Sequence, residues 1–277
     1  MLINYTAEKL RTMKLPAMAA EYLRQSETPS MDALSFDERV GMMIDAEWLS
    51  KENSRIQKLT KDAKLRYPTA CFADIDYRPS RKIDRAYIAR LSNFSWVKEA
   101  KNLFLTGCTG TGKTWLACAF GAEACRLGMR VAFYRINRLL GEMAALTSFI
   151  EIGRFLAKLN KADILILDDW GLATLTPIEC RLIKEVFEER SRGRSTVISA
   201  QPPVSAWHSL FEDSTIADGA LDRIVHNSHR LEMQGPSMRS LTDKDQNGGA
   251  PCGVQVQNIL TRSDLSTDTV HGGGLNA

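Results

Sequence analysis

The chain has 277 residues, of which 44% are hydrophobic and 25% charged, with a formal net charge of +3. This length is enough for one large domain and one smaller domain, and the charge is too small to identify a partner on its own. No apolar run approaches the roughly 18 residues of a membrane-spanning helix, and residues 1–11 lack the apolar stretch of a secretory signal, so we expect a cytoplasmic protein with no membrane partner.

The first part of the chain, residues 1–66, predicts a small all-α domain. Little Gly or Pro interrupts it, and apolar residues recur at helical spacing at Leu49, Ile56, Leu59 and Ala63. Lys51, Arg55 and Lys58 follow one another at i, i+4 and i+7, so they share one face of a helix. A basic face of this kind is either solvated or binds phosphates, and the spacing alone leaves both interpretations open.

The pattern changes twice in the rest of the chain. Residues 67–94 contain the Tyr67-Pro68 break and a further proline, which predicts a linker region. Over residues 95–239, apolar runs alternate with helical patterns, which indicates an α/β domain with a parallel sheet flanked by helices. The predicted strands are residues 102–106, 131–134, 164–167 and 196–199, and the helices between them include residues 113–127 and one that follows the capping box of Thr176 and Glu179. Residues 240–277 have no Phe, Trp or Tyr, so we expect a disordered tail.

A phosphate-binding motif lies between the first predicted strand and the helix after it. Residues 107–114 match the P-loop pattern G-x-x-x-x-G-K-[ST]. The backbone N–H groups of such a loop surround phosphates, its Lys reaches the β and γ phosphates of ATP, and its last hydroxyl binds Mg²⁺. The predicted nucleotide-binding residues are Gly107, Cys108, Thr109, Gly110, Thr111, Gly112, Lys113 and Thr114.

Two carboxylates end the third predicted strand. We expect Asp168 to hold Mg²⁺ together with Thr114, and Asp169 to orient or deprotonate the attacking water. Capping of a helix by this acidic pair is the structural alternative. The fourth strand runs into Gln201, which could sense the γ phosphate with Ser199 behind it, although a Gln at a strand end is more often an ordinary loop residue.

The motifs taken together resemble a known family, the IstB-like helper ATPases of bacterial insertion sequences, which are relatives of the DnaC helicase loaders in the AAA+ class. The similarity covers the chain up to the tail and is carried by K-L-P-A-M-A-A-E-Y at residues 14–22, D-A-E-W at 45–48, the P-loop, L-D-D-W-G at 167–171, L-D-R at 221–223 and G-P-S-M-R at 235–239. The resemblance implies that Arg223 is an arginine finger entering a neighbour's site and that Arg239 is the sensor 2 residue. This chain has Asp169 where many AAA+ proteins have Glu, so turnover is expected to be slow.

The resemblance also implies a function. Such a protein would bind ATP and Mg²⁺, assemble with ATP into a homo-oligomer on double-stranded DNA, and recruit a cognate transposase, with ATP hydrolysis as a switch. The face of Lys51, Arg55 and Lys58 would then contact DNA phosphates without reading bases. Two alternatives stay open: a DnaC-like loader of a replicative helicase, and a nucleotide-binding scaffold that does not hydrolyse ATP.

Overall fold

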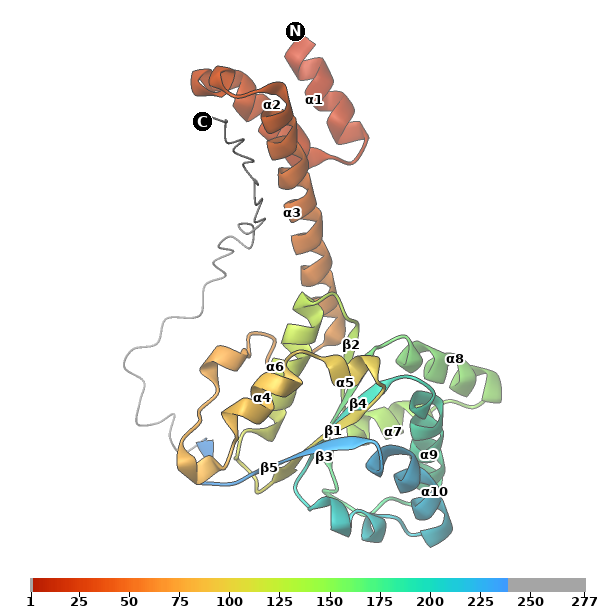
Figure 1. The fold of residues 1–277 in the computed structure, drawn as a ribbon. Coiled ribbons are helices and arrows are strands. Elements are labelled where there is room, and N and C mark those ends of the chain that lie inside the picture. Colours follow the sequence, from red (N-terminus) through yellow and green to blue (C-terminus); the bar gives the residue numbers. More distant parts are fainter. Residues whose placement is uncertain (1, 239–277) are drawn as a thin grey trace, which may run out of the picture.

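The computed structural model describes residues 2–238, so Arg239 and the predicted tail lie outside the described residues. An α/β core carries a small group of helices at the end of one long helix, which stands away from the core (Figure 1). This arrangement confirms the predicted α/β class with an all-α N-terminal part. No helix within residues 2–238 is both long and apolar enough to cross a membrane.

The centre of the core is a five-stranded parallel sheet with the order β2-β3-β4-β1-β5. Its strands are β1 (Asn102–Gly107), β2 (Val131–Arg135), β3 (Ile164–Trp170), β4 (Ser195–Ala200) and β5 (Ser228–Met233). The four predicted strands are confirmed as β1 to β4. The sequence analysis missed β5, which lies at an edge of the sheet, because its first three residues are polar and only Leu231 and Met233 in it are buried.

Helices cover both faces of the sheet. They are α6 (Lys113–Arg126), α7 (Ile136–Ala144), α8 (Phe149–Asn160), α9 (Pro177–Ser191) and α10 (Ser214–Val225). Side chains alternate between the faces along each strand, so Leu103 and Leu105 pack with α6, whereas Phe104 packs with α7, α9 and α10. The predicted start of α9 is confirmed, because the Thr176 hydroxyl accepts a hydrogen bond from the Glu179 N–H and the Glu179 carboxylate accepts one from the Thr176 N–H.

Residues 67–94 are packed against the α6 face of the sheet and do not form a free connection. This segment contains α4 (Arg85–Leu91), and α5 (Ser95–Lys98) follows it. Ile75, Ile83 and Ile88 are buried in the same apolar cluster as the side chains of α6. The prolines that suggested a linker therefore mark turns within a packed segment, which also forms one wall of the site described below.

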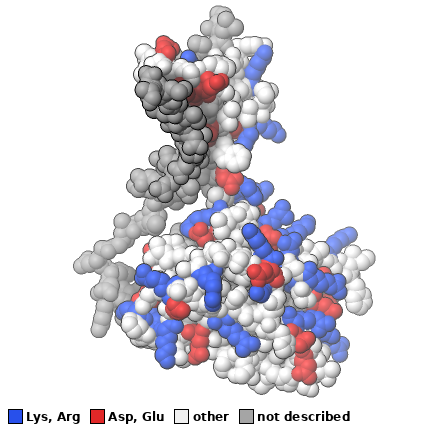
Figure 2. Space-filling view, viewed as in Figure 1, with Lys and Arg blue, Asp and Glu red and all other residues white. Residues whose placement is uncertain are grey.

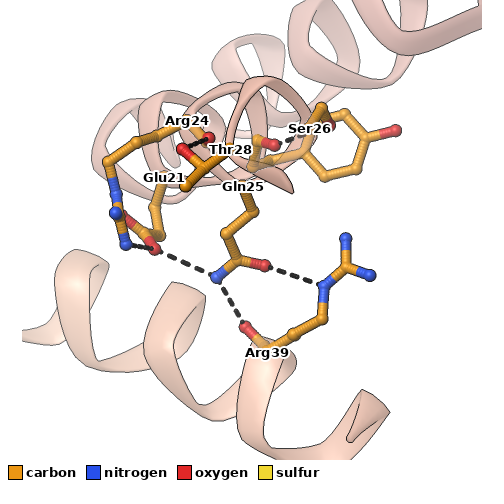
Figure 3. Close-up of polar contacts among 7 residues, drawn as sticks. Glu21, Arg24, Gln25, Ser26, Thr28 and Arg39 are labelled. Carbon is orange, nitrogen blue, oxygen red and sulfur yellow. Dashed lines mark hydrogen bonds and ion pairs between the residues drawn. The ribbon is translucent and has the colours of Figure 1, made fainter. Parts of the chain in front are cut away.

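The N-terminal helices are α1 (Leu2–Thr12), α2 (Pro16–Glu27) and α3 (Phe36–Ala63). The carboxylate of Glu47 on α3 accepts hydrogen bonds from the N–H groups of Ala17 and Met18, at 2.9 and 3.0 Å, and thereby caps the start of α2. Gln25 is buried between the two helices and donates to the Glu21 carboxylate and to the Arg39 carbonyl (Figure 3). These contacts hold α2 against the first turns of α3.

The far end of α3 joins the core. The helix packs on α6 and β2, and the chain continues from it into the core cluster through Leu65. A Cβ atom at Gly121 of α6 would lie 2.8 Å from the Leu65 side chain, so the absence of a side chain at Gly121 permits this close contact. The helix α3 therefore connects the N-terminal helices directly to the helix that follows the P-loop.

A buried arginine ties three elements of the core together. Arg190 is 2% exposed and donates hydrogen bonds to the carbonyls of Leu159, Ala162 and Ser195 and to the Thr196 hydroxyl. Burial lowers the pKa of its guanidinium to about 9. Arg190 therefore satisfies buried oxygens near the ends of α8 and the start of β4.

Replacing Arg190 with Met is expected to lower the free energy of unfolding by about 3 kcal/mol, because four buried oxygens lose their donor. The measurement is denaturant unfolding of both variants and the parent. Arg192→Met is the matched control, since Arg192 lies just beyond the same helix with 70% of its side chain exposed, and it should cost less than about 0.5 kcal/mol. Equal losses in the two variants would contradict this role of Arg190.

Candidate functional site

The P-loop connects β1 to α6 and takes a backbone shape that only glycine tolerates at its key positions. Gly107 and Gly110 have φ angles of 142° and 84°. A Cβ atom at Gly107 would lie 2.0 Å from the Met233 carbonyl oxygen, and one at Gly110 would lie 2.2 Å from the Ser237 hydroxyl. Both positions therefore require Gly, for conformation and for space.

The P-loop lysine is held by the loop itself. Lys113 is 8% exposed, and its Nζ donates to the carbonyls of Gly107 and Cys108 at 2.7 and 2.8 Å. The Thr111 hydroxyl donates to the Cys108 carbonyl at 2.9 Å, which closes the turn. The ammonium group thus lies at the mouth of the loop, where phosphate oxygens can replace the carbonyls as its acceptors.

Thr114 and Asp168 form the pair expected for a Mg²⁺ site. The Thr114 Oγ1 donates to Asp168 Oδ1 at 2.8 Å, and Asp168 is fully buried at the end of β3. Burial raises the pKa of the Asp168 carboxyl, whereas the hydrogen bond from Thr114 lowers it. Its second oxygen, Oδ2, is buried and has no hydrogen-bond partner within the described chain.

These donors fit Mg²⁺, which commonly binds through one or two protein oxygens together with phosphates. A hydroxyl beside a buried carboxylate with a spare oxygen offers the hard ligands that this ion prefers. Among the residues that the structure describes, no group of three or more His, Cys, Asp and Glu could hold a metal ion. The pair of Thr114 and Asp168 would therefore hold Mg²⁺ jointly with phosphate oxygens.

Asp169 differs from its neighbour in backbone and in exposure. Its φ is 63°, in the left-handed region, and its side chain is 36% exposed with Oδ2 3.7 Å from the Arg135 Nε. The next helix, α9, is capped by Thr176, so Asp169 does not cap it. The left-handed turn separates the two carboxylates, so that Asp168 is buried and Asp169 borders the cavity.

A cavity of about 490 Å³ brings the predicted residues together. It is lined by Lys113, Thr114 and Asp169, and also by Ser199 and Gln201 from the end of β4. Its other wall was not predicted, because all of it except Arg66 comes from the segment that the sequence analysis assigned to a linker. That wall includes Arg66, Tyr67, Asp74, Asp76 and Arg81. No local motif marks these residues, and only the packing of the segment beside the P-loop identifies them.

Arg223 does not line this cavity. It lies on α10, where its Nη1 donates to the Gly219 carbonyl at 2.6 Å and its Nη2 is 3.5 Å from the Glu188 carboxylate of α9. Any contact of Arg223 with a nucleotide would therefore have to involve a neighbouring molecule. Arg239 belongs to the residues that the structure does not describe.

The predicted basic face on α3 is exposed but partly neutralised. Lys51 lies 3.5 Å from the Glu47 carboxylate, and Arg55 lies 3.6 Å from the Glu52 carboxylate. Arg55 also donates to the Gly128 carbonyl at 3.4 Å, at the end of α6. Lys58 is exposed and forms no ion pair with the described part of the chain.

Known proteins are similar to this chain in sequence and in fold. A family model described as "IstB-like ATP binding protein" matches residues 8–246. The chain is 38% identical over 239 residues to a protein of Sinorhizobium fredii named as an insertion sequence ATP-binding protein, which covers 86% of this chain and 97% of that protein. It is 40% identical over 205 residues to the ATP-binding protein of insertion sequence IS1162 from Pseudomonas fluorescens, which covers 74% and 89%.

Two solved structures are similar in fold. The DnaC helicase loader has a TM-score of 0.52 and 23% identity, covering 61% of this chain and 99% of that chain. DnaI has a TM-score of 0.52 and 21% identity, covering 62% and 92%. At these identities the likeness concerns the AAA+ fold alone. The match to the family model, together with the P-loop and the Thr114 and Asp168 pair, shows that the chain belongs to the family of IstB-like ATP-binding proteins of insertion sequences.

Proposed function

We propose that this protein is an ATP-hydrolysing helper of a bacterial insertion sequence, which assembles with ATP on duplex DNA and recruits the transposase. The observation that carries the proposal is the cavity in which Lys113, Thr114 and Asp169 meet beside the buried Asp168. Nucleotide binding follows from the family, and the two carboxylates at the end of β3 support hydrolysis.

Each of the residues around the cavity would have a separate role in hydrolysis. Lys113 would bind the β and γ phosphates, and Thr114 with Asp168 would hold Mg²⁺, which supplies neutralisation of negative charge when it is bound. Asp169, which lines the cavity at the end of β3, would orient the attacking water and accept its proton. Gln201 lines the same cavity and would contact the γ phosphate.

Assembly is proposed from the position of Arg223. Its guanidinium is half-buried on α10 and away from the cavity of its own chain, so it would complete the site of a neighbour in a head-to-tail homo-oligomer. An arginine supplied by a neighbour stabilises charge on the transferring phosphoryl group. Hydrolysis would then depend on contact between subunits.

A second basic face supports the DNA part of the proposal. Arg154 and Lys158 lie on α8 and Lys161 is its C-cap residue, so the three are spaced at i, i+4 and i+7 like the basic residues on α3. All three are exposed, and none forms an ion pair with any residue of the described range. Figure 2 shows Lys and Arg side chains, with Asp and Glu among them, over the visible face of the core, including the flank where Figure 1 places α8. We propose that both faces contact DNA phosphates and that the α8 face contributes more.

Charge reversal on the two faces tests this proposal. Changing Arg154, Lys158 and Lys161 to Glu is expected to weaken duplex binding at every sequence and to reduce the slope of log affinity against log salt by about three. The matched change of Lys51, Arg55 and Lys58 to Glu should reduce it by about one, because two of these cations already face carboxylates.

The measurement is fluorescence anisotropy with ATP and labelled DNA over a range of salt concentrations. ATP affinity serves as the control and should be the same in both triple variants and the parent. If both variants bind DNA like the parent, the proposal that these two faces contact DNA is refuted. Preference of the parent for single-stranded over duplex DNA would instead favour the helicase-loader function.

A further inference from the structure

A buried arginine stands beside the P-loop with little to compensate its charge. Arg81 is 6% exposed and lines the nucleotide cavity. Its nearest carboxylate oxygen, on Asp76, is 3.9 Å from Nη1, and Asp76 is already paired with Arg78. Its Nε is buried without a hydrogen-bond partner among the described residues. A buried cation in this state is costly unless an anion approaches it.

The guanidinium of Arg81 joins the P-loop to the segment before it. Nη2 donates to the Thr111 carbonyl, and Nη1 donates to the Asp76 carbonyl at 3.1 Å. The contact with the P-loop is close, since a Cβ atom at Gly112 would lie 3.0 Å from Nη2. One planar side chain thus spans two backbone segments with two separate nitrogen donors in a fixed geometry, which the single nitrogen of a lysine does not provide.

The same residue meets the chain that follows β5. The Gln234 N–H donates to the Arg81 carbonyl at 3.1 Å, and the Met238 N–H donates to the Gly110 carbonyl at 2.8 Å. Figure 1 shows the end of β5 beside the orange segment that precedes α4. Arg81 therefore occupies the point where three segments meet on one side of the P-loop.

The contact with Thr111 has a consequence for the donors of the loop. In a trans peptide, the C=O and the N–H of one unit point in opposite directions. Because Arg81 holds the Thr111 carbonyl, the Gly112 N–H of the same peptide is directed away from Arg81. Backbone N–H groups at this position of a P-loop are the groups that bind phosphate.

We propose that Arg81 is a positioning residue of the nucleotide site, which fixes the Thr111–Gly112 peptide so that its N–H is ready for the phosphates of a nucleoside di- or triphosphate. The polyphosphate in turn offsets the buried charge of Arg81. Burial lowers the pKa of this guanidinium, in agreement with a cation whose nearest carboxylate, on Asp76, lies 3.9 Å away. The inference rests on the proposed nucleotide site and adds a residue that no motif contains.

The test compares affinities for ATP and AMP in Arg81→Met, measured by calorimetry with Mg²⁺ present. We expect ATP affinity to fall about tenfold or more, and AMP affinity, which does not depend on a β phosphate, to change by less than about twofold. Arg190→Met is the matched control, because Arg190 is also a buried arginine that binds carbonyls but lies outside the cavity. Its ratio of ATP to AMP affinity should equal that of the parent.

A ratio in Arg81→Met equal to the parental ratio would overturn the proposal and leave Arg81 a structural residue. If Arg81→Met does not fold, Arg81→Lys replaces it: we expect a loss of ATP affinity of at least about threefold, since a lysine has a single nitrogen in place of the two that bind the Thr111 and Asp76 carbonyls in a fixed planar geometry. Parental ATP affinity in Arg81→Lys would equally overturn it. Lys113→Ala distinguishes failure of the nucleotide site from failure of the role of Arg81. If Lys113→Ala still binds ATP, the nucleotide site itself is refuted. If Lys113→Ala loses ATP binding while Arg81→Met binds ATP like the parent, only the role of Arg81 is refuted.

Discussion

Lys113→Ala is expected to lower ATP affinity on the order of a hundredfold, because the variant loses the ammonium that would bind two phosphates. The side chain faces the cavity and donates to the carbonyls of Gly107 and Cys108 in its own loop, so the fold should remain intact. Calorimetric titration with ATP gives the affinity, and thermal unfolding without nucleotide gives the stability.

The control for this variant is Lys98→Ala, which removes an exposed lysine of α5 that does not line the cavity. Its ATP affinity should match that of the parent. A Lys113→Ala protein that unfolds at the parental temperature and still binds ATP with parental affinity would show that the nucleotide lies elsewhere.

A mixture of two inactive variants is expected to regain ATPase activity. Asp169→Asn should keep an intact Arg223 but lack the residue that activates water, whereas Arg223→Ala should keep a complete site but offer its neighbour no arginine. With random head-to-tail assembly, half of the sites retain Asp169 and half of these face an intact Arg223. Activity should therefore recover to about a quarter of the parental level.

The measurement is phosphate release with duplex DNA, for each variant alone and for the equal mixture. The parent at half concentration calibrates the signal, and light scattering verifies that both variants assemble. Activity in the mixture equal to the mean of the two separate variants, with assembly intact, would exclude an arginine finger at Arg223.

Much of the core was predictable because its signals are local. Each of the strands β1 to β4 contains a short apolar run, and Gly107 to Thr114 form one contiguous motif whose residues determine its backbone shape. The edge strand β5 was missed, since Ser228, His229 and Arg230 have none of the apolar character that marks a strand buried on both faces.

The partial neutralisation of the basic face on α3 could have been predicted from the sequence. Glu47 precedes Lys51 by four residues and Glu52 precedes Arg55 by three, so both ion pairs follow from helical spacing. The bond from Arg55 to the Gly128 carbonyl could not be read in this way, because it joins segments 73 residues apart.

Arg81 illustrates why the rest of the site escaped prediction. Its partner Thr111 lies 30 residues further along the chain, and neither residue type nor spacing indicates that they meet. The segment of Arg81 carries prolines and short turns, which are as common in linkers as in packed walls. The burial of Ile75 and Ile83, which belong to that segment, in the core cluster identifies it as a packed wall.

The long helix α3 has a mechanical consequence. Its 28 residues extend over about 42 Å, and one end rests on α6, the helix that begins at Lys113. A tilt of about 5° at that end displaces the other end by about 4 Å, because a continuous helix behaves as a stiff rod on this scale. The structure thus contains a lever whose short arm rests on α6 and whose long arm carries α1 and α2, so that displacements of α6 too small to alter the core would relocate the whole N-terminal surface.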